Sequence, residues 1–317
     1  MDSELEQWVE MLRSPDESDR LVAVKMLQHL GDEEALDPLI EALSDKNVGV
    51  QKLVVTTLWE MANHRAVRPL IACLGSPDES VRSEALGALK ELVIPDDLLL
   101  LLDALHQDDF YMRLNITILL RKIHDIQALP YVLPLFASER EELREAAVTT
   151  LRYLNQVTTC PPALGLMQDP SPSVRRETAL TLSYLADGTV VELLNRALVE
   201  DKDWQVRRNA AQSLAMLKPV ESVPALNAAM QDEHWQVRKF AARALQQVSD
   251  DSSIPVLVNA LADEYSDVRR DAAIALGNLG NPAVLNSLQQ TLDDPDADVR
   301  IFSQRAIDQI EKAGAEV

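Results

Sequence analysis

The sequence predicts an all-α protein, a right-handed α-solenoid (superhelix) of about ten 31-residue helix pairs that covers residues 1–317. Three observations lead to this fold class. The chain is 47% hydrophobic but only 4% aromatic, so its core must come mainly from Leu, Ala, Val and Ile, a composition that favours helices. Nine glycines leave little for hairpin turns, and no segment alternates apolar and polar residues as a half-buried strand does. The third observation is an internal repeat.

The repeat is clearest at one position, usually Arg. Aligned on the frequent pair Val-Arg, this position recurs every 31 residues, with a single interval of 32, at Arg20, Gln51, Arg82, Arg113, Arg144, Arg175, Arg207, Arg238, Arg269 and Arg300. A fixed period of this length along a whole chain is typical of a solenoid, in which each repeat packs against its neighbours. Chain length alone would have predicted two globular domains.

Each repeat is expected to contain two helices. The first is short and opens near a proline, because proline suits the first helical turn; examples are Pro38, Pro69, Pro224 and Pro255. The second begins four residues before the recurring position, after N-cap residues whose side chains can accept backbone hydrogen bonds: Asp16, Asn47, Asp78, Asp109, Ser171, Asp203 and Asp296. Apolar residues then recur at spacings of three and four, as at Val268, Ala272, Ala273, Leu276 and Leu279.

These residues carry a family resemblance. The segment DPDADVR at Asp294 and its nine siblings resemble the short HEAT-like repeats of the phycobiliprotein lyase type over essentially the whole chain. In HEAT repeats an Asp between the helices and an Arg six residues later form a hydrogen-bonded ladder, which implies the pairs Asp169/Arg175, Asp201/Arg207, Asp232/Arg238, Asp263/Arg269 and Asp294/Arg300 here. The N-terminal repeats depart from this pattern, with Ser14, Ser76, Gln107 and Ser138 in place of the Asp, and Gln51 in place of the Arg beside Asp45.

Within the single solenoid we expect less regular repeats over residues 1–155 and regular repeats over residues 160–317. Between them, Pro161, Pro162 and Gly165 should shorten the first helix, which favours a change of curvature near residues 155–168. An equally good interpretation is that the two prolines merely occupy the usual position at a helix start.

The net charge of −21 opposes nonspecific binding to nucleic acids and anionic membranes. The longest apolar stretch, at Leu98, is too short to cross a bilayer, and no secretory leader is evident at the N-terminus. We therefore expect a cytoplasmic protein with no nucleic-acid partner and no integral membrane association. Cys73 and Cys160 stand far apart, so neither a disulfide framework nor a metal-ligand cluster is expected.

Two tryptophans stand out against the repeat. Trp204 and Trp235 occupy the first helical position after the cap, which is normally solvated and is polar or small in most other repeats. A cation follows four residues after each indole, on the same face of the helix, and the flanking repeats carry a cation there too. Aromatic residues and Arg are enriched at binding hot spots. The predicted partner-binding residues are Trp204, Trp235, Arg208, Lys239, Arg176, Arg270 and Phe110.

A structural interpretation of the same residues stays open. The indoles would lie flat across the seam between repeats, and the cations would pair with Glu177, Asp203 or Asp271. Sequence position does not determine the direction of these side chains.

We expect no catalytic residue, no metal site and no enzymatic activity. The five histidines are scattered and none is followed by Glu, so the repeated His-Glu pairs of the HEAT-like deoxyhypusine hydroxylases are missing; His234 stands at a cap and is expected to be structural. Cys73 aligns with Ala42 and is expected in the core, whereas Cys160 lies in the irregular segment and could be exposed. One such thiol is not an iron–sulfur site.

The resemblance implies a non-catalytic scaffold or adaptor whose concave face, lined by second helices, binds a protein partner without a cofactor. It also implies a partner that is an A-type iron–sulfur carrier or a component of phycobilisome assembly or turnover in a cyanobacterium. A bilin-binding subunit or chaperone of a phycobiliprotein bilin lyase is the alternative, since the lyase relatives act on a linear tetrapyrrole. Its propionates need cations and its rings need apolar walls, which the tryptophans and cations would also supply.

Overall fold

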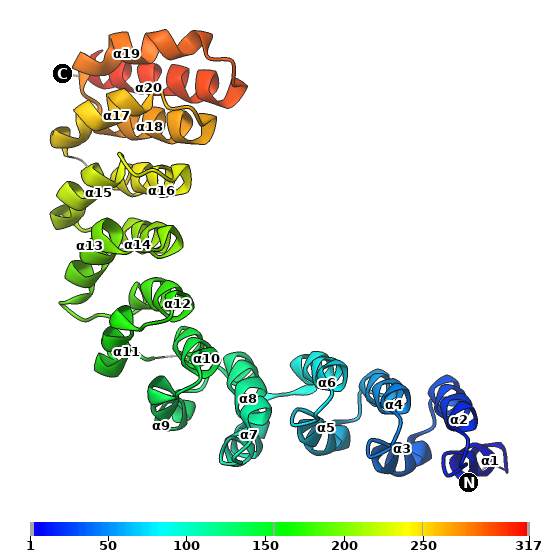
Figure 1. The fold of residues 1–317 in the computed structure, drawn as a ribbon. Helices are drawn as coiled ribbons and strands as arrows, with labels where there is room; N and C mark the ends of the chain where they lie inside the picture. The colour runs from blue at the N-terminus through cyan, green and yellow to red at the C-terminus, as the bar shows by residue number, and fades with distance from the viewer. Residues whose placement is uncertain (1–2, 155, 249, 316–317) are drawn as a thin grey trace. The chain divides into compact units, whose positions relative to one another are not determined.

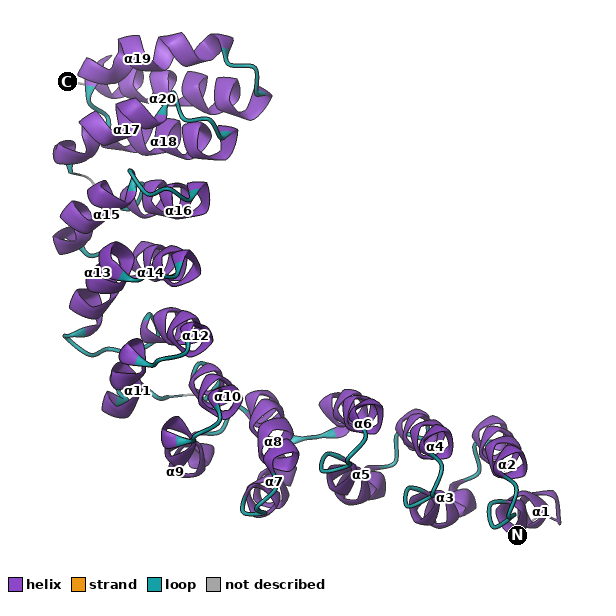
Figure 2. Cartoon of the chain, viewed as in Figure 1, coloured by secondary structure: helices purple, strands orange, loops and turns teal. Residues whose placement is uncertain are grey.

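The computed structural model describes residues 3–154, 156–248 and 250–315. It divides into two compact units, Met1–Gln156 and Val157–Val317. In the described residues every regular element is a helix, and successive helices form pairs (Figure 1). Figure 2 shows the short loops that join them. The all-α solenoid that the period predicts is confirmed.

Ten α-helices lie in the described part of the first unit. They are α1 (Ser3–Met11), α2 (Glu17–Leu30), α3 (Leu36–Ala42), α4 (Val48–Glu60), α5 (Val67–Cys73), α6 (Glu79–Leu92), α7 (Leu98–Leu105), α8 (Phe110–Ile123), α9 (Leu129–Val132) and α10 (Glu141–Leu151). Each even-numbered helix packs on the odd-numbered helix before it and on the next even-numbered helix. The second helices of the pairs therefore form one continuous layer within the unit.

The described part of the second unit repeats this arrangement with ten more α-helices. They are α11 (Pro161–Gly165), α12 (Pro172–Leu182), α13 (Val190–Glu200), α14 (Trp204–Leu217), α15 (Val223–Ala229), α16 (Trp235–Leu245), α17 (Ile254–Ala260), α18 (Ser266–Leu279), α19 (Leu285–Gln290) and α20 (Ala297–Ala315). Short 3-10 segments precede or extend first helices of both units, at Glu33–Ala35, His64–Ala66, Pro95–Asp97, Ile126–Ala128, Leu133–Ala137, Leu166–Gln168, Val220–Ser222, Asp251–Ser253, Pro282–Val284 and Thr291–Asp293.

Most second helices begin where the sequence predicts their caps. Backbone N–H groups in the first turns donate to the side chains of Asp16, Asn47, Asp78, Asp109, Asp203 and Asp296. Each such bond satisfies a donor that has no partner inside the helix and stabilises the start by about 1 kcal/mol. Ser171 stands at the predicted position but does not cap α12, because its Oγ lies 3.1 Å from Ser173 Oγ instead.

Small residues set the spacing between second helices in the second unit. Ala179, Ala211, Ala242 and Ala273 occupy equivalent positions, four residues after the recurring arginine, and are completely buried in α12, α14, α16 and α18. Large aliphatic side chains fill the space between the two helices of a pair; Leu226 of α15 is one of them, with no exposed surface. The core is therefore a row of similar contacts rather than one central cluster.

Two first helices are short. The five-residue α11 begins at Pro161 and ends at Gly165, so its prolines both occupy the usual start and lie in a shortened helix. The four-residue α9, which was not predicted, gives way to a 3-10 segment with Pro134 in its first turn. The boundary between the units falls inside residues 155–168. The change of curvature there stays a prediction, and residue 155, the end of the predicted first part, lies outside the described residues.

The close approach of α18 and α20 leads to a prediction. A Cβ on Gly277 would lie 2.8 Å from the Cβ and 2.9 Å from the Cα of Ala306. Alanine favours a helix over glycine by about 1 kcal/mol, but overpacking against a backbone carbon typically costs about 1–3 kcal/mol. We expect Gly277→Ala to lower the urea midpoint of the full chain. The matched variant Gly87→Ala in α6, where nothing lies within 4 Å, should raise it, and a rise in both variants would contradict the argument.

Candidate functional site

At several positions the recurring arginine links its repeat to the next. Its Nε and Nη2 donate to both carboxylate oxygens of an Asp in the following repeat, and its Nη1 donates to backbone carbonyls of its own repeat. The Nε–O distances are 2.6–2.8 Å in the rungs Arg20/Asp45, Arg175/Asp201, Arg207/Asp232, Arg238/Asp263 and Arg269/Asp294. The ladder implied by the resemblance is confirmed, with one correction. The carboxylate comes from the next repeat, whereas the Asp six residues earlier offers its carbonyl.

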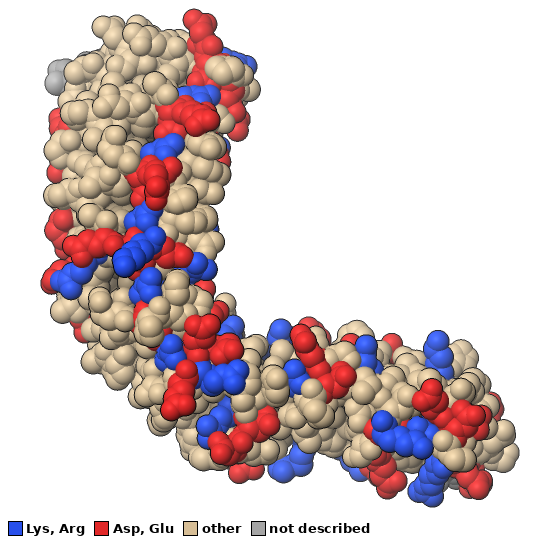
Figure 3. All heavy atoms as spheres, in the orientation of Figure 1, with Lys and Arg blue, Asp and Glu red and all other residues tan. Residues whose placement is uncertain are grey.

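The rungs are largely shielded from water. The side chains of Arg269 and Asp294 are 12% and 7% exposed. The hydrogen bond from Arg269 lowers the pKa of Asp294 below its usual range, and the same bond raises the pKa of Arg269. A bidentate pair of this kind constrains geometry as well as charge, so each rung holds two repeats in register. Figure 3 shows acidic and basic atoms alternating along the repeats of the second unit.

The two tryptophans lie beside this ladder at the starts of α14 and α16, where both are half-buried. The Trp204 ring stacks on His234 with 5.0 Å between centroids and an interplanar angle of 26°. Trp235 stacks on Tyr265 at 5.0 Å and 14°. His234 and Tyr265 directly precede α16 and α18, so each indole crosses the seam to the next repeat. Both indoles therefore lie across the seam, as in the structural interpretation, and each keeps some exposed surface.

Carboxylates engage three of the four predicted cations. Arg176 pairs with Asp203, Lys239 Nζ lies 2.7 Å from Asp267, and Arg270 Nη2 lies 2.8 Å from Asp267 and 3.1 Å from Asp271. These hydrogen bonds lower the pKa of Asp203, through Arg176, and of Asp267, through Lys239. Two of the acids are those named by the structural interpretation, so much of this charge serves contacts between repeats.

Arg208 differs from the other three cations. Its Nε and Nη2 lie 3.1 and 2.8 Å from Asn209 Oδ1, and among the described residues no carboxylate pairs with it. Its Cζ is 5.6 Å from the centroid of the Trp204 ring, and Lys239 Nζ is at the same distance from Trp235. Both distances allow a cation–π attraction. We call Trp204, Trp235, Arg208 and Lys239 the indole row.

Phe110 begins α8 and belongs to the first unit. The Cζ of Arg140, which directly precedes α10, lies 3.8 Å from the centroid of its ring. Phe110 thus makes the same kind of contact as the tryptophans. In each case the first residue of a second helix contacts the cap residue that precedes the second helix of the following repeat. Glu17 and Asn47 make this contact as well, through a hydrogen bond of 2.6 Å.

His234 and Tyr265, the rings that hold the indoles, were not predicted from the sequence. A signal was available, since each follows its tryptophan by 30 residues, the spacing from a first helical residue to the next cap. A comparison of equivalent positions does not reveal this contact, because it joins different positions of neighbouring repeats.

Burial makes both thiols harder to ionise. Cys73 is half-buried, and burial raises its pKa to about 11. Cys160 is buried, contrary to the expectation that it could be exposed, and burial raises its pKa as well. Within the described residues, no three side chains of His, Cys, Asp or Glu gather in a way that could hold a metal ion.

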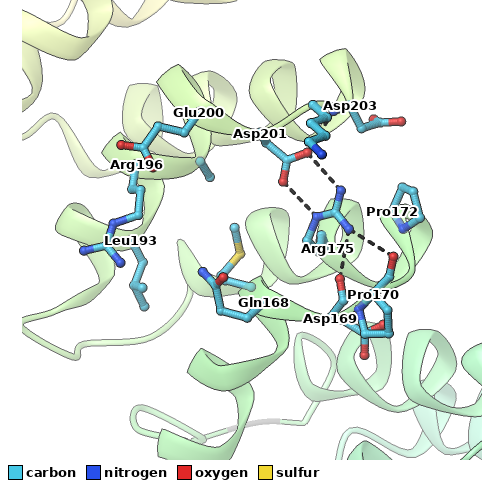
Figure 4. Close-up of a pocket in the computed structure, with 13 residues that line it drawn as sticks. Gln168, Asp169, Pro170, Pro172, Arg175, Leu193, Arg196, Glu200, Asp201 and Asp203 are labelled. Atoms are coloured by element: carbon cyan, nitrogen blue, oxygen red, sulfur yellow. Dashed lines mark hydrogen bonds and ion pairs between the residues drawn. The ribbon is translucent and has the colours of Figure 1, made fainter.

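A cavity of about 680 Å³ lies between the 3-10 segment Leu166–Gln168, the start of α12 and helix α13 (Figure 4). Figure 4 shows Arg175 on one side, bonded to the Asp201 carboxylate and to the carbonyls of Asp169 and Pro170. On the other side Arg196 of α13 pairs with Glu192 at 2.9 Å. Arg175 thus serves the ladder and Arg196 a local ion pair, and we assign the cavity no ligand.

Paired helices joined by an arginine–aspartate ladder define an α-solenoid. The chain belongs to the HEAT repeat family, whose model matches residues 5–90, 98–179, 161–235 and 223–308. Within the described part, no helix is both long enough and apolar enough to cross a membrane.

Solved structures resemble the chain in fold. One is an engineered protein, 21% identical with a TM-score of 0.56, in which the match covers 98% of this chain and 99% of that one. Another comes from a structure in which Kap95p binding induces the switch loops of RanGDP to adopt the GTP-bound conformation; it is 14% identical, with a TM-score of 0.63 and 96% of this chain covered. This chain spans 49% of the length of that second chain. No curated protein matches the sequence.

Proposed function

We propose that the chain is a non-catalytic, cytoplasmic scaffold that binds a protein partner through the indole row. The main support is that each indole stacks on a neighbouring ring and still keeps exposed surface. An anchor held in this way loses little side-chain freedom on binding, and Trp and Arg are the residues that most often dominate interface energies. Membership of the HEAT repeat family supports binding rather than catalysis.

Arg208 supplies polarity to this surface. Because no described carboxylate neutralises it, its guanidinium is the cation of the row most available to an acidic group on a partner. Lys239 is already engaged by Asp267, and its role is to hold the seam beside Trp235.

The family resemblance of the sequence supports an A-type iron–sulfur carrier as the partner, with a protein of phycobilisome assembly or turnover as the other member of this proposal. Bilin binding, as a subunit or chaperone of a bilin lyase, is the weaker alternative. Propionates need available cations, whereas Asp203, Asp267 and Asp271 already engage most of those in this region.

Calorimetric titration with a purified A-type iron–sulfur carrier tests the proposal. Replacing both Trp204 and Trp235 by Ala should weaken binding by about 30-fold or more, the loss typical of a hot spot. Arg208→Glu should also weaken it without removing a seam contact, which separates binding from stability. Tyr184→Ala, at an aromatic residue that is 55% exposed outside the row, should leave affinity unchanged.

Unchanged affinity in the folded double variant and in Arg208→Glu would contradict the proposal. Absorbance of phycocyanobilin mixed with the chain separates the alternative, since a spectral shift lost in the double variant would favour bilin binding.

A further inference from the structure

The ladder of the first unit lacks several of its carboxylates, and the gaps are filled in different ways. In the repeat after Arg82, Gln107 stands at the rung position instead of Asp. The Arg82 Cζ lies 3.6 Å from the centroid of the Tyr111 ring. An aromatic face thus takes the place of the carboxylate. Gln51 is uncharged and needs no carboxylate partner, and its Nε2 donates to the Asp45 carbonyl at 2.6 Å.

Arg113 differs from both, since it carries a charge and does not stack on an aromatic face among the described residues. Its Nε donates to the Gln107 carbonyl at 3.0 Å, and its Nη1 lies 3.7 Å from Asp108, whose side chain is 101% exposed. No described residue presents a carboxylate to its Nε and Nη2 in the way that Asp45 does for Arg20. Asp109 is the other acid close to Arg113 in the sequence. Its Oδ1 accepts a hydrogen bond from Met112 N and so caps the start of α8.

Ser138 stands where the missing carboxylate belongs, 25 residues after Arg113, the interval that separates Arg207 from Asp232. Its backbone, at φ −61° and ψ 142°, matches that of the rung residue Asp201, at φ −66° and ψ 134°. Its Oγ also accepts from the amide two residues later, Arg140 N, as the Asp201 side chain does from Asp203 N. The local structure is therefore built for an Asp, and only the carboxylate is missing.

The gap is part of a cavity of about 450 Å³ lined by Arg113, Ser138, His106, Tyr131, Pro130 and Pro134, among others. The rings of His106 and Tyr131 meet edge to face, with 5.5 Å between centroids. A single guanidinium therefore adjoins a wall of prolines and an aromatic ring. His106, Tyr131 and both prolines are exposed, so the site is shallow and suits a segment of a protein better than an enclosed small molecule.

We infer that this cavity is a docking site for an Asp or Glu side chain, flanked by an apolar residue, on a segment of a partner protein. The carboxylate supplies the missing rung as a bidentate acceptor for Arg113, and the apolar neighbour packs on Tyr131 and the prolines. Asp108 does not block it, because it reaches one nitrogen at long range and is fully hydrated. The inference rests on the proposed scaffold function but concerns a site in the first unit. Its test is therefore independent of the test of the indole row.

The test follows the side-chain Nε–H signal of Arg113 by NMR in the full chain. The probe is the peptide Gly-Leu-Asp-Leu-Gly, acetylated and amidated so that it carries one carboxylate, with its Asn counterpart as the comparison. We expect the Asp peptide to shift the signal and to bind at least about tenfold more tightly than the Asn peptide. Phenylacetate, a free carboxylate with an apolar group, should bind more weakly than the Asp peptide.

Variants make the result decisive, with binding followed by polarisation of a fluorescent form of the Asp peptide. Ser138→Asp should supply the rung from within, which raises Tm and abolishes peptide binding; Arg113→Gln should abolish binding too. The control Arg68→Gln removes an arginine charge at an exposed residue of α5, outside this cavity, and should keep full affinity for the peptide. The inference would be overturned by undiminished binding in Ser138→Asp, by equal affinity for the Asn peptide, or by no binding to the wild type. Tighter binding of phenylacetate than of the Asp peptide would show that the carboxylate does not come from a protein segment.

Discussion

Leu101→Ala should lower the free energy of unfolding of the first unit by about 2–5 kcal/mol. Leu101 lies in α7 with no exposed surface, and its truncation removes buried methyl groups and leaves a cavity that the packed helices only partly close. Neighbouring repeats depend on one another in a solenoid, so the loss should extend beyond the site itself. Urea unfolding followed by far-UV circular dichroism measures it.

Leu99→Ala is the matched control on the same helix. Its side chain is 74% exposed, so the identical substitution should change stability by no more than about 0.5 kcal/mol. Both variants change Leu to Ala within α7, and the difference between them therefore isolates burial. Equal losses in the two variants would show that helix propensity, and not core packing, governs the effect.

Asp294→Ala should destabilise the second unit by about 3 kcal/mol. The Asp294 carboxylate accepts from Arg269 Nε at 2.7 Å and Nη2 at 2.8 Å, and both side chains are largely buried. Removal of one partner leaves a shielded charge without its counterion, which typically costs about 3–5 kcal/mol. The carbonyls of Asp263 and Glu264 still accept from Arg269, so we expect the lower end of this range. Hydrogen exchange in α18 and α20 should increase in parallel.

Glu192→Ala removes an exposed ion pair of the same unit and serves as the control. Arg196 and Glu192 are 49% and 72% exposed, so its loss should cost no more than about 0.5 kcal/mol. A similar loss in both variants would mean that burial of the rung does not matter.

The same rung makes a prediction about pH. Arg269 holds the folded pKa of Asp294 below its ordinary value of 3.8, so its stabilisation is complete above pH 3.8 and disappears as the pH falls through the lower folded pKa. The difference in stability between wild type and Asp294→Ala should therefore be constant near neutrality and shrink below pH 3.8. A difference that stays constant down to pH 2 would contradict a carboxylate origin.

Much of the fold could be read from local patterns. The cap residues Asp16 and Asp203 act within their own first turns, so their roles follow from a few neighbouring positions. The shortened α11 also follows from its own prolines. By contrast, the early end of α9 was not predicted, although Pro130 and Pro134 are plain in the sequence. One proline alone is compatible with a helix start, and only the two together indicate a helix that ends early.

The candidate sites were less accessible to this reasoning. The equivalence of Trp204 and Trp235 was visible, yet their stacking on His234 and Tyr265 was not. The departure of Ser138 from the family pattern was also visible, but a missing Asp does not by itself distinguish a harmless gap from an arginine left facing a cavity. The rung position is non-acidic for both Arg82 and Arg113, and of the two only Arg82 stacks over an aromatic ring among the described residues.

The 31-residue period by itself determined the helix pairs and their order, because the contacts of a solenoid repeat as its sequence does. The tertiary structure alone decided which side of the seam each indole covers, which carboxylates engage the cations, and where Arg113 is left open. These outcomes depend on side chains about 30 residues apart in neighbouring repeats, whose directions are set by how whole helices pack.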